Sequence, residues 1–214
     1  MSEPIVAAYG AWKSPISSDL IVTSTISLGQ IQLDGDDIYW NEARPTEGGR
    51  NVIVRRAADG TTTDVTPPAF NARTTVHEYG SGAYTVDAGV VYFSNYADQR
   101  LYRQEPGAPP QPITPASDMR YADGVIDRRR GRMICVREDH TGAGDAANSI
   151  VALALDGSGK AVVLAHGYDF YSTPRLSPDG EYLAWLAWNH PNMPWDGTEL
   201  WHATLSEGFG PTGC

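Results

Sequence analysis

Residues 51–54 read Asn-Val-Ile-Val, and this short apolar segment is the first of four that recur along the chain. The three later segments are Arg100-Leu101-Tyr102, Ser149-Ile150-Val151-Ala152 and Glu199-Leu200-Trp201. The equivalent apolar positions Val52, Leu101, Ile150 and Leu200 are separated by 49, 49 and 50 residues. A fixed period of about 20 to 50 residues is typical of solenoids and propellers, and the upper end of that range suits a propeller blade.

Three further short strands can be placed around each of these segments. The second strands are expected at Ile38–Trp40, Val90–Phe93, Met133–Val136 and Tyr182–Trp185, which are rich in β-branched and aromatic residues. First strands are expected to end at Leu33, Val86, Ile126 and Leu176, and fourth strands at Val65, Ile113 and Val163. The sequence therefore predicts an all-β fold: one partial β-propeller domain over residues 1–214, with blades near 28–67, 80–115, 121–165 and 172–205. Helix is expected only as a single turn near Ser17–Ile21.

The fourth repeat has no outer strand in its sequence pattern. After Leu205 the chain reads Ser-Glu-Gly-Phe-Gly-Pro-Thr-Gly-Cys, which is typical of turns. We therefore expect an incomplete last blade and a ring that continues in a longer parent protein. An unpaired strand edge favours association with another chain, so we also expect self-association through this open blade.

Composition excludes several classes of function. The chain has 26 acidic and 16 basic residues and a net charge of −10, which disfavours nucleic acid as a partner. Cys135 and Cys214 have no metal-binding spacing, and no phosphate-binding loop is evident, so no metal and no cofactor are expected. No apolar run has the length of a membrane span and no secretory leader is seen, so no membrane partner and a cytoplasmic location are expected.

A serine nucleophile of the α/β-hydrolase kind is missing from the sequence. No serine has a glycine two positions before it, so the pattern G-x-S-x-G does not occur. We therefore nominate no catalytic residue and expect this chain to be inactive by itself.

Polar loops gather on one predicted face of the propeller. The loops between second and third strands and the connections between blades emerge on the same face, and binding residues concentrate on such loops. That face would carry His77 with Glu78, Glu42 with Arg44, and Arg137 with Glu138. Each pair is either a substrate contact or a structural ion pair, and the sequence leaves both readings open. Trp188, Trp195 and Trp201 are expected to pack between sheets rather than to stack on a ligand.

Four segments carry a family resemblance. Residues 176–185, Leu-Ser-Pro-Asp-Gly-Glu-Tyr-Leu-Ala-Trp, resemble the SPDG propeller repeat found in prolyl-oligopeptidase-family peptidases and in TolB. Residues 9–16, 76–80 and 189–201 resemble the N-terminal propeller of the S9 acylaminoacyl-peptidase and dipeptidyl-peptidase-like enzymes. The resemblance spans nearly the whole chain.

The resemblance implies a parent enzyme in which a propeller gates a C-terminal α/β-hydrolase domain. In that reading the chain selects peptide substrates for a hydrolase domain that this sequence does not contain, and its partners are the peptide and that domain. Some members of the family bind the substrate N-terminus or a carbonyl through propeller Glu or Arg residues. The candidate substrate-binding residues are therefore Glu42, Arg44, His77, Glu78, Arg137, Glu138 and Arg175. The alternative is a TolB-like propeller that serves as a platform for protein interaction.

Overall fold

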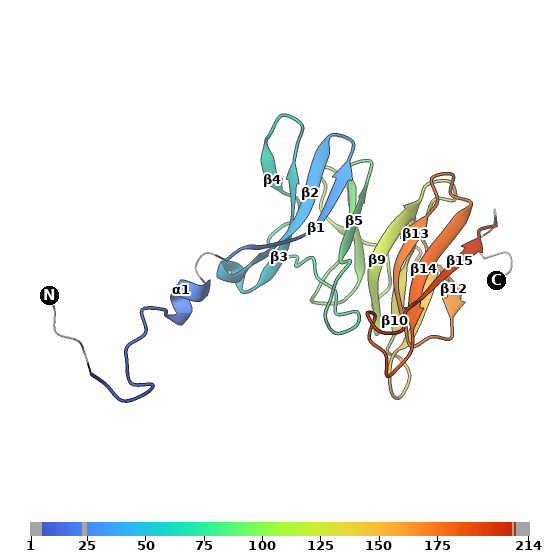
Figure 1. Ribbon diagram of the computed structural model, residues 1–214. Coiled ribbons are helices and arrows are strands. Elements are labelled where there is room, and N and C mark those ends of the chain that lie inside the picture. The colour runs from blue at the N-terminus through green and yellow to red at the C-terminus, as the bar shows by residue number, and fades with distance from the viewer. Residues whose placement is uncertain (1–5, 23–24, 207, 209–214) are drawn as a thin grey trace.

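The computed structural model describes residues 6–22, 25–206 and 208 of the 214-residue chain. Within these residues the strands form four antiparallel sheets, each made of consecutive strands (Figure 1). Blade 1 contains β1 (Ser27–Asp34), β2 (Asp37–Arg44), β3 (Arg50–Arg56) and β4 (Thr62–Asp64). Blade 2 contains β5 (Tyr84–Asp87), β6 (Val90–Ser94), β7 (Leu101–Gln104) and β8 (Gln111–Pro112). Blade 3 contains β9 (Met119–Asp127), β10 (Arg132–Asp139), β11 (Ala147–Ala154) and β12 (Ala161–His166), and blade 4 contains β13 (Phe170–Leu176), β14 (Tyr182–Trp188) and β15 (Glu199–Thr204). The expected all-β partial propeller, with three strands in its last blade, is confirmed for the described residues.

The described helices lie outside the blades or between their strands. Helix α1 (Ser18–Val22) forms at the single helical turn that the sequence predicted, and the 3-10 helix η1 (Pro45–Glu47) lies between β2 and β3. Residues 6–22 extend away from blade 1 as an arm (Figure 1). Neither of these helices has the length and apolar character that crossing a membrane requires.

Adjacent blades pack face to face, with their first strands innermost. β1 contacts β5, β5 contacts β9, and β9 contacts β13. Three apolar clusters fill the three interfaces, represented by Tyr39 with Phe93, Tyr92 with Met133, and Ile134 with Trp185. Burying one such large side chain stabilises the fold by about 1.5–3 kcal/mol. Because blade 3 is covered on both faces, β11 is buried along nearly its whole length, and its residues 150–154 form a continuous apolar run.

A residue with positive φ on the innermost side of each blade links it to the next; this residue lies in a β-bulge in blades 1, 3 and 4 and just before β5 in blade 2. Gln30, Gly82, Asp123 and Thr173 all have positive φ, between 51° and 65°. The side-chain oxygen of Gln30 accepts the Ala83 N–H at 3.1 Å, Gly82 O accepts the Asp123 N–H at 2.8 Å, and Asp123 Oδ2 accepts the Thr173 N–H at 3.1 Å. A Cβ at Gly82 would overlap the Asp123 carboxylate, so glycine is required where blades 2 and 3 approach. One contact is thus repeated, with different chemistry, at all three interfaces.

Four candidate residues expected on loops lie in strands instead. Glu42 and Arg44 lie at the end of β2 and point to the same face of the sheet, and Arg137 and Glu138 lie near the end of β10. The loop prediction was wrong because polar residues near the ends of strands were read as loop residues. Cross-strand partners extend the ladders there, with Glu42 opposite Val52 and Glu138 opposite Asn148.

Candidate functional site

The connection between blades 1 and 2 folds into a tight turn at residues 74–80. His77 and Glu78 both adopt left-handed backbone conformations, with φ of 55° and 62°. Residues other than glycine rarely adopt this conformation. The turn closes through the Glu78 N–H to Thr75 O, at 3.0 Å, and the Gly80 N–H to Val76 O, at 3.1 Å. Such backbone persists only where surrounding structure holds it in place.

Blade 3 supplies that support through a buried carboxylate. Glu138, on β10, has only 5% of its side chain exposed, and its Oε1 accepts the His77 N–H at 2.7 Å. Its Oε2 lies 3.0 Å from His140 Nε2 and 3.8 Å from Arg120 Nη1. Arg120 also donates to Thr75 O at 3.2 Å and to Glu78 at 3.3 Å. The Glu138 carboxylate of β10 and the Arg120 guanidinium of β9 therefore hold the turn in place by hydrogen bonds.

Blade 4 covers the His77 ring with aromatic side chains. The ring of His77 packs edge-on to Phe170 and Trp188, with centroids 5.6 Å and 5.5 Å away. Phe170 stacks on Trp188 at 5.4 Å, and His190 packs edge-on to Phe170 at 4.8 Å. Burial lowers the pKa of His77, although Glu138 and Asp123 act in the opposite direction. His77 is therefore neutral near pH 7, and its buried Nε2 has no hydrogen-bond partner within the described residues.

We call this group the junction cluster: Arg120, Glu138 and His140 of blade 3, His77 and Glu78 of the connection, and Phe170, Trp188 and His190 of blade 4. It brings three of the sequence candidates together, namely His77, Glu78 and Glu138. Glu78 is its most accessible carboxylate, with 83% of the side chain exposed. The cluster thus combines a carboxylate, a guanidinium, a neutral imidazole and an aromatic wall. It lies at the same end of the blades as the connection between blades 1 and 2.

Glu42 and Arg44 lie apart from this cluster, on the face of blade 1 that is turned away from blade 2. Arg44 donates to both oxygens of Asp64, at 2.6 Å and 2.7 Å, and to Glu42 at 2.7 Å. The hydrogen bonds that Arg44 donates to Asp64 raise the pKa of Arg44 most, and the same bonds lower the pKa of Asp64. Arg44 on β2 and Asp64 on β4 thus pair across β3. This supports the interpretation of Glu42 and Arg44 as a structural ion pair.

Arg137 and Arg175 also lie apart from the junction cluster. Arg137 follows the alternation of β10 and points to the face opposite that of Glu138, toward blade 2. Its Nε is buried without a hydrogen-bond partner in the described structure. Arg175, on β13, is exposed and donates to its neighbouring carbonyl, Pro174 O, at 2.8 Å.

Sequence reasoning missed the role of Arg120 and did not nominate His140, Phe170, Trp188 or His190. Arg120 is directly opposite Glu138 in the β9–β10 register, so a predicted register would have identified this cross-strand pair of opposite charges. The expectation that the tryptophans pack between sheets is confirmed for Trp188, which is buried, but is wrong for Trp195, which is 77% exposed.

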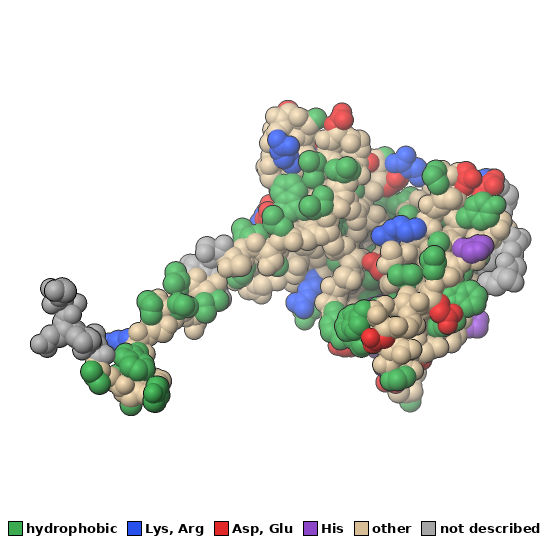
Figure 2. Space-filling view, in the orientation of Figure 1, with side chains coloured by type: hydrophobic (Ala, Val, Ile, Leu, Met, Phe, Trp, Pro, Cys, Tyr) green, Lys and Arg blue, Asp and Glu red, His purple; other side chains and the backbone are tan. Residues whose placement is uncertain are grey.

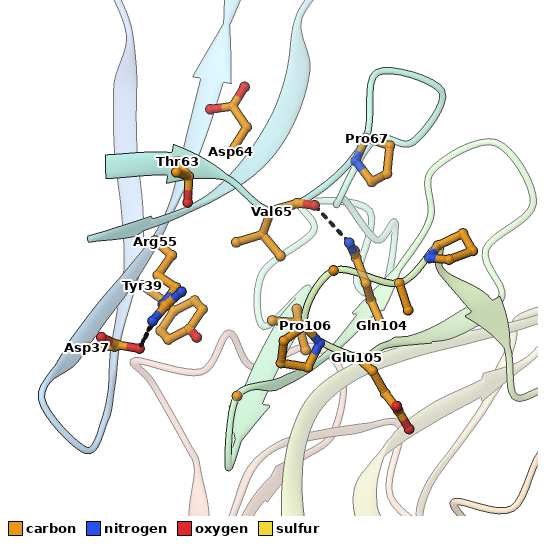
Figure 3. Close-up of a pocket in the computed structure, with 15 residues that line it drawn as sticks. Asp37, Tyr39, Arg55, Thr63, Asp64, Val65, Pro67, Gln104, Glu105 and Pro106 are labelled. Carbon is orange, nitrogen blue, oxygen red and sulfur yellow. Dashed lines mark hydrogen bonds and ion pairs between the residues drawn. The ribbon is translucent and has the colours of Figure 1, made fainter. Parts of the chain in front are cut away.

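A cavity of about 490 Å³ lies between blades 1 and 2 and contains none of the sequence candidates (Figure 3). Its walls include Tyr39 and Arg55 of blade 1 and Gln104 and Pro106 of blade 2. Arg55 is paired with Asp37 at 2.7 Å, and Gln104 donates to Val65 O at 2.9 Å. These interactions engage Arg55, Asp37 and the amide N–H of Gln104, whereas the junction cluster combines an exposed carboxylate with a guanidinium and an aromatic wall and is chemically the richer site.

Comparison with solved structures identifies close structural neighbours. A structure described as puromycin hydrolase superposes with a TM-score of 0.84 and 39% identity, over 94% of this chain and 34% of its own. A puromycin-hydrolyzing peptidase of Mycobacterium tuberculosis superposes with a TM-score of 0.85 and 38% identity, over 96% and 34% respectively. A prolyl endopeptidase is similar in fold alone, at 16% identity and a TM-score of 0.52, over 83% of this chain and 26% of its own. The chain therefore spans about a third of the length of these puromycin-hydrolysing neighbours.

Two other comparisons are negative. No protein-family model matches the sequence, and no curated protein matches it.

Proposed function

We propose a function from one premise: this chain belongs to the S9 peptidase family, as a segment of its β-propeller. In this proposal the segment selects substrates for a serine peptidase whose catalytic domain lies outside the 214 residues. The substrates are puromycin and short peptides with similar aminoacyl amide bonds. The observation that carries the proposal is 39% identity to puromycin hydrolase over 94% of the chain.

The junction cluster is the part of the propeller that we assign to substrate selection. It combines the exposed carboxylate of Glu78, the Arg120 guanidinium and an aromatic wall, which suit the amine, carbonyl and side chain of an aminoacyl group. It is also built on three different segments, so its geometry is fixed by the stacking of the blades. We prefer this function to an interaction platform because the neighbours at 38–39% identity are described as hydrolysing puromycin.

A chimera tests the proposal. This chain would replace the equivalent third of puromycin hydrolase, with the rest of that enzyme unchanged. We expect a folded enzyme that hydrolyses puromycin, because the two segments superpose with a TM-score of 0.84. Release of the aminonucleoside would be followed by chromatography.

The control is puromycin hydrolase with the same third deleted. A folded chimera that cleaves a small activated ester, which needs no propeller contact, but does not cleave puromycin would contradict the proposal. Equal hydrolysis by the deletion control would contradict it as well, because the propeller segment would then contribute nothing.

A further inference from the structure

Arg73, in the connection between blades 1 and 2, is an exposed basic residue that makes no ion pair within the described residues, although acidic residues outnumber basic ones by 26 to 16. Its guanidinium lies 4.9 Å from the centre of the Tyr96 ring, in the loop between β6 and β7. A guanidinium stacked on an aromatic ring keeps the N–H groups along its edge free for a second partner. Arg73 is therefore oriented by the protein without being neutralised by it.

The segments that carry Arg73 and Tyr96 are held together by several backbone contacts. Ala72 pairs with Asn95 in an isolated antiparallel bridge. The Tyr96 N–H donates to Asn71 O at 2.9 Å, and the side-chain oxygen of Asn95 accepts the Asn71 N–H at 3.1 Å. These contacts lie between the connection and blade 2, whose four strands are all present. The position of Arg73 over the ring thus needs no residue beyond blade 2.

Arg73 lies directly before the tight turn that belongs to the junction cluster. Thr75 joins the two places, because its N–H donates to Gln99 of the β6–β7 loop at 2.9 Å and its carbonyl accepts from Arg120 at 3.2 Å. Arg73 and the exposed Glu78 are five residues apart, so even an extended backbone would separate their Cα atoms by no more than about 18 Å. The turn shortens this distance, which brings both side chains within reach of one short ligand.

The carboxylate on the same loop of blade 2 as Tyr96 has other partners. Asp98 accepts hydrogen bonds from Asn95 at 3.0 Å and from the Tyr102 hydroxyl at 2.6 Å. Figure 2 shows the basic side chains of one face of the molecule as isolated spots rather than as a continuous patch. Single basic residues of this kind match a ligand with one carboxylate better than a polyanion.

We propose that Arg73 binds the C-terminal carboxylate of short peptide substrates whose amino group is bound by Glu78. The inference rests on the proposed function and adds a substrate class to it, namely peptides of a few residues with a free C-terminus. A guanidinium and a carboxylate form two parallel hydrogen bonds, which are strong and directional. Tyr96 is a positioning residue, because it acts only by holding the Arg73 guanidinium. Puromycin has no carboxylate and does not use Arg73.

The test compares a peptide with its own amide in the chimera described above. Trialanine and trialanine amide differ only at the C-terminus. The chimera should hydrolyse the acid with a kcat/KM roughly tenfold higher than that of the amide, mainly through a lower KM. Arg73→Gln should remove this preference, and Arg73→Lys, which keeps the charge but not the planar pair of donors, should retain part of it. Puromycin hydrolysis should be unchanged in both variants.

Two sets of control variants accompany the test. Arg56→Gln removes the same charge from an exposed arginine at the other end of blade 1 and should keep the preference. Tyr96→Phe keeps the ring and should keep the preference, whereas Tyr96→Leu should weaken it. Equal kcat/KM for acid and amide in the chimera overturns the proposal. A preference that survives Arg73→Gln overturns it too, and so does an Arg73→Gln variant that slows puromycin hydrolysis as much as trialanine hydrolysis.

Binding to the isolated chain separates failure of this inference from failure of the proposed function. Saturation-transfer NMR observes the ligand and needs no catalytic domain. Trialanine should receive more saturation from the 214-residue chain than trialanine amide does, and Arg73→Gln should reduce the trialanine signal to the level of the amide. A chimera that does not cleave puromycin contradicts the proposed function alone. Equal transfer to trialanine from the wild-type chain and from Arg73→Gln overturns the role of Arg73.

Discussion

Glu138 is the residue on which the junction cluster depends most. Its carboxylate is almost fully buried, and its oxygens face the His77 N–H, the His140 ring and the Arg120 guanidinium. A buried charge is tolerated only with such partners, because desolvation of an unpaired charge is costly. The same contacts that stabilise Glu138 fix the left-handed backbone at His77.

Replacing Glu138 with Ala should therefore destabilise the fold. The change leaves the His77 N–H without its acceptor and the Arg120 guanidinium without its buried partner, for an expected loss of about 1–3 kcal/mol. Urea unfolding followed by tryptophan fluorescence would measure it. The matched control Glu78→Ala removes an exposed carboxylate with one 3.3 Å contact and should change stability little. Equal losses for the two variants would contradict the assignment.

His77 should make stability depend on pH in the mildly acidic range. Burial lowers its pKa in the folded state, so the unfolded state binds the proton more readily. Stability is then fully present above the unfolded pKa and falls as the pH drops from about 7 to about 5. The variant His77→Asn tolerates the left-handed backbone and does not titrate, so its unfolding free energy should change less over this range. Parallel pH profiles for the two proteins would argue against a buried neutral imidazole.

At the level of the blade, the interfaces combine a continuous apolar contact with one polar contact at the innermost bulge. The apolar contact tolerates many side chains, as the three clusters show. The bulge contact is less tolerant, because it requires a positive φ and a close approach in the same place. Gly82 meets both requirements where blades 2 and 3 meet.

Gly82→Ala should separate these two requirements. Gly82 and Gly107 have φ of 65° and 73°, but a Cβ overlaps Asp123 only at Gly82. Gly107→Ala should cost about 1 kcal/mol for the backbone alone, and Gly82→Ala should cost clearly more. Chemical unfolding of both variants measures the difference. Equal costs would show that blades 2 and 3 do not approach closely at this point.

The sequence predicted the positions of the strands better than it predicted the contacts between blades. The anchors Val52, Leu101, Ile150 and Leu200 all fall in third strands. The first three are buried, because a central strand of a blade needs apolar residues, whereas Leu200 lies on the edge strand β15 and is 73% exposed. The junction cluster could be predicted only in part. His77 is 61 residues from Glu138 and 93 from Phe170, and only the stacking of blades, which local pattern does not encode, brings them together.

The whole molecule is a scaffold that positions residues from several blades and, by the proposal, leaves the chemistry to another domain. Its sequence contains no G-x-S-x-G pattern, and it spans about a third of its peptidase neighbours. By the same proposal, the junction cluster is composed of groups that bind and orient a substrate.

The isolated chain should therefore release nothing from puromycin or from aminoacyl chromogenic substrates. The assay would use purified protein, with puromycin hydrolase as the positive control. Turnover that survives purification and titrates with an active-site serine reagent would show that the chain has a nucleophile of its own.

The central claim, that the junction cluster selects substrate, is tested most directly by kcat/KM for puromycin in the chimera with matched variants. Glu78→Gln and Arg120→Gln should lower kcat/KM mainly through KM, by roughly tenfold, which corresponds to about 1.4 kcal/mol of lost binding. Hydrolysis of a small activated ester should be unchanged. Arg44→Gln, which alters a partly exposed ion-pair network on blade 1, apart from the cluster, should leave both activities as they were. Unchanged KM in the two cluster variants, with folding intact, would contradict the account.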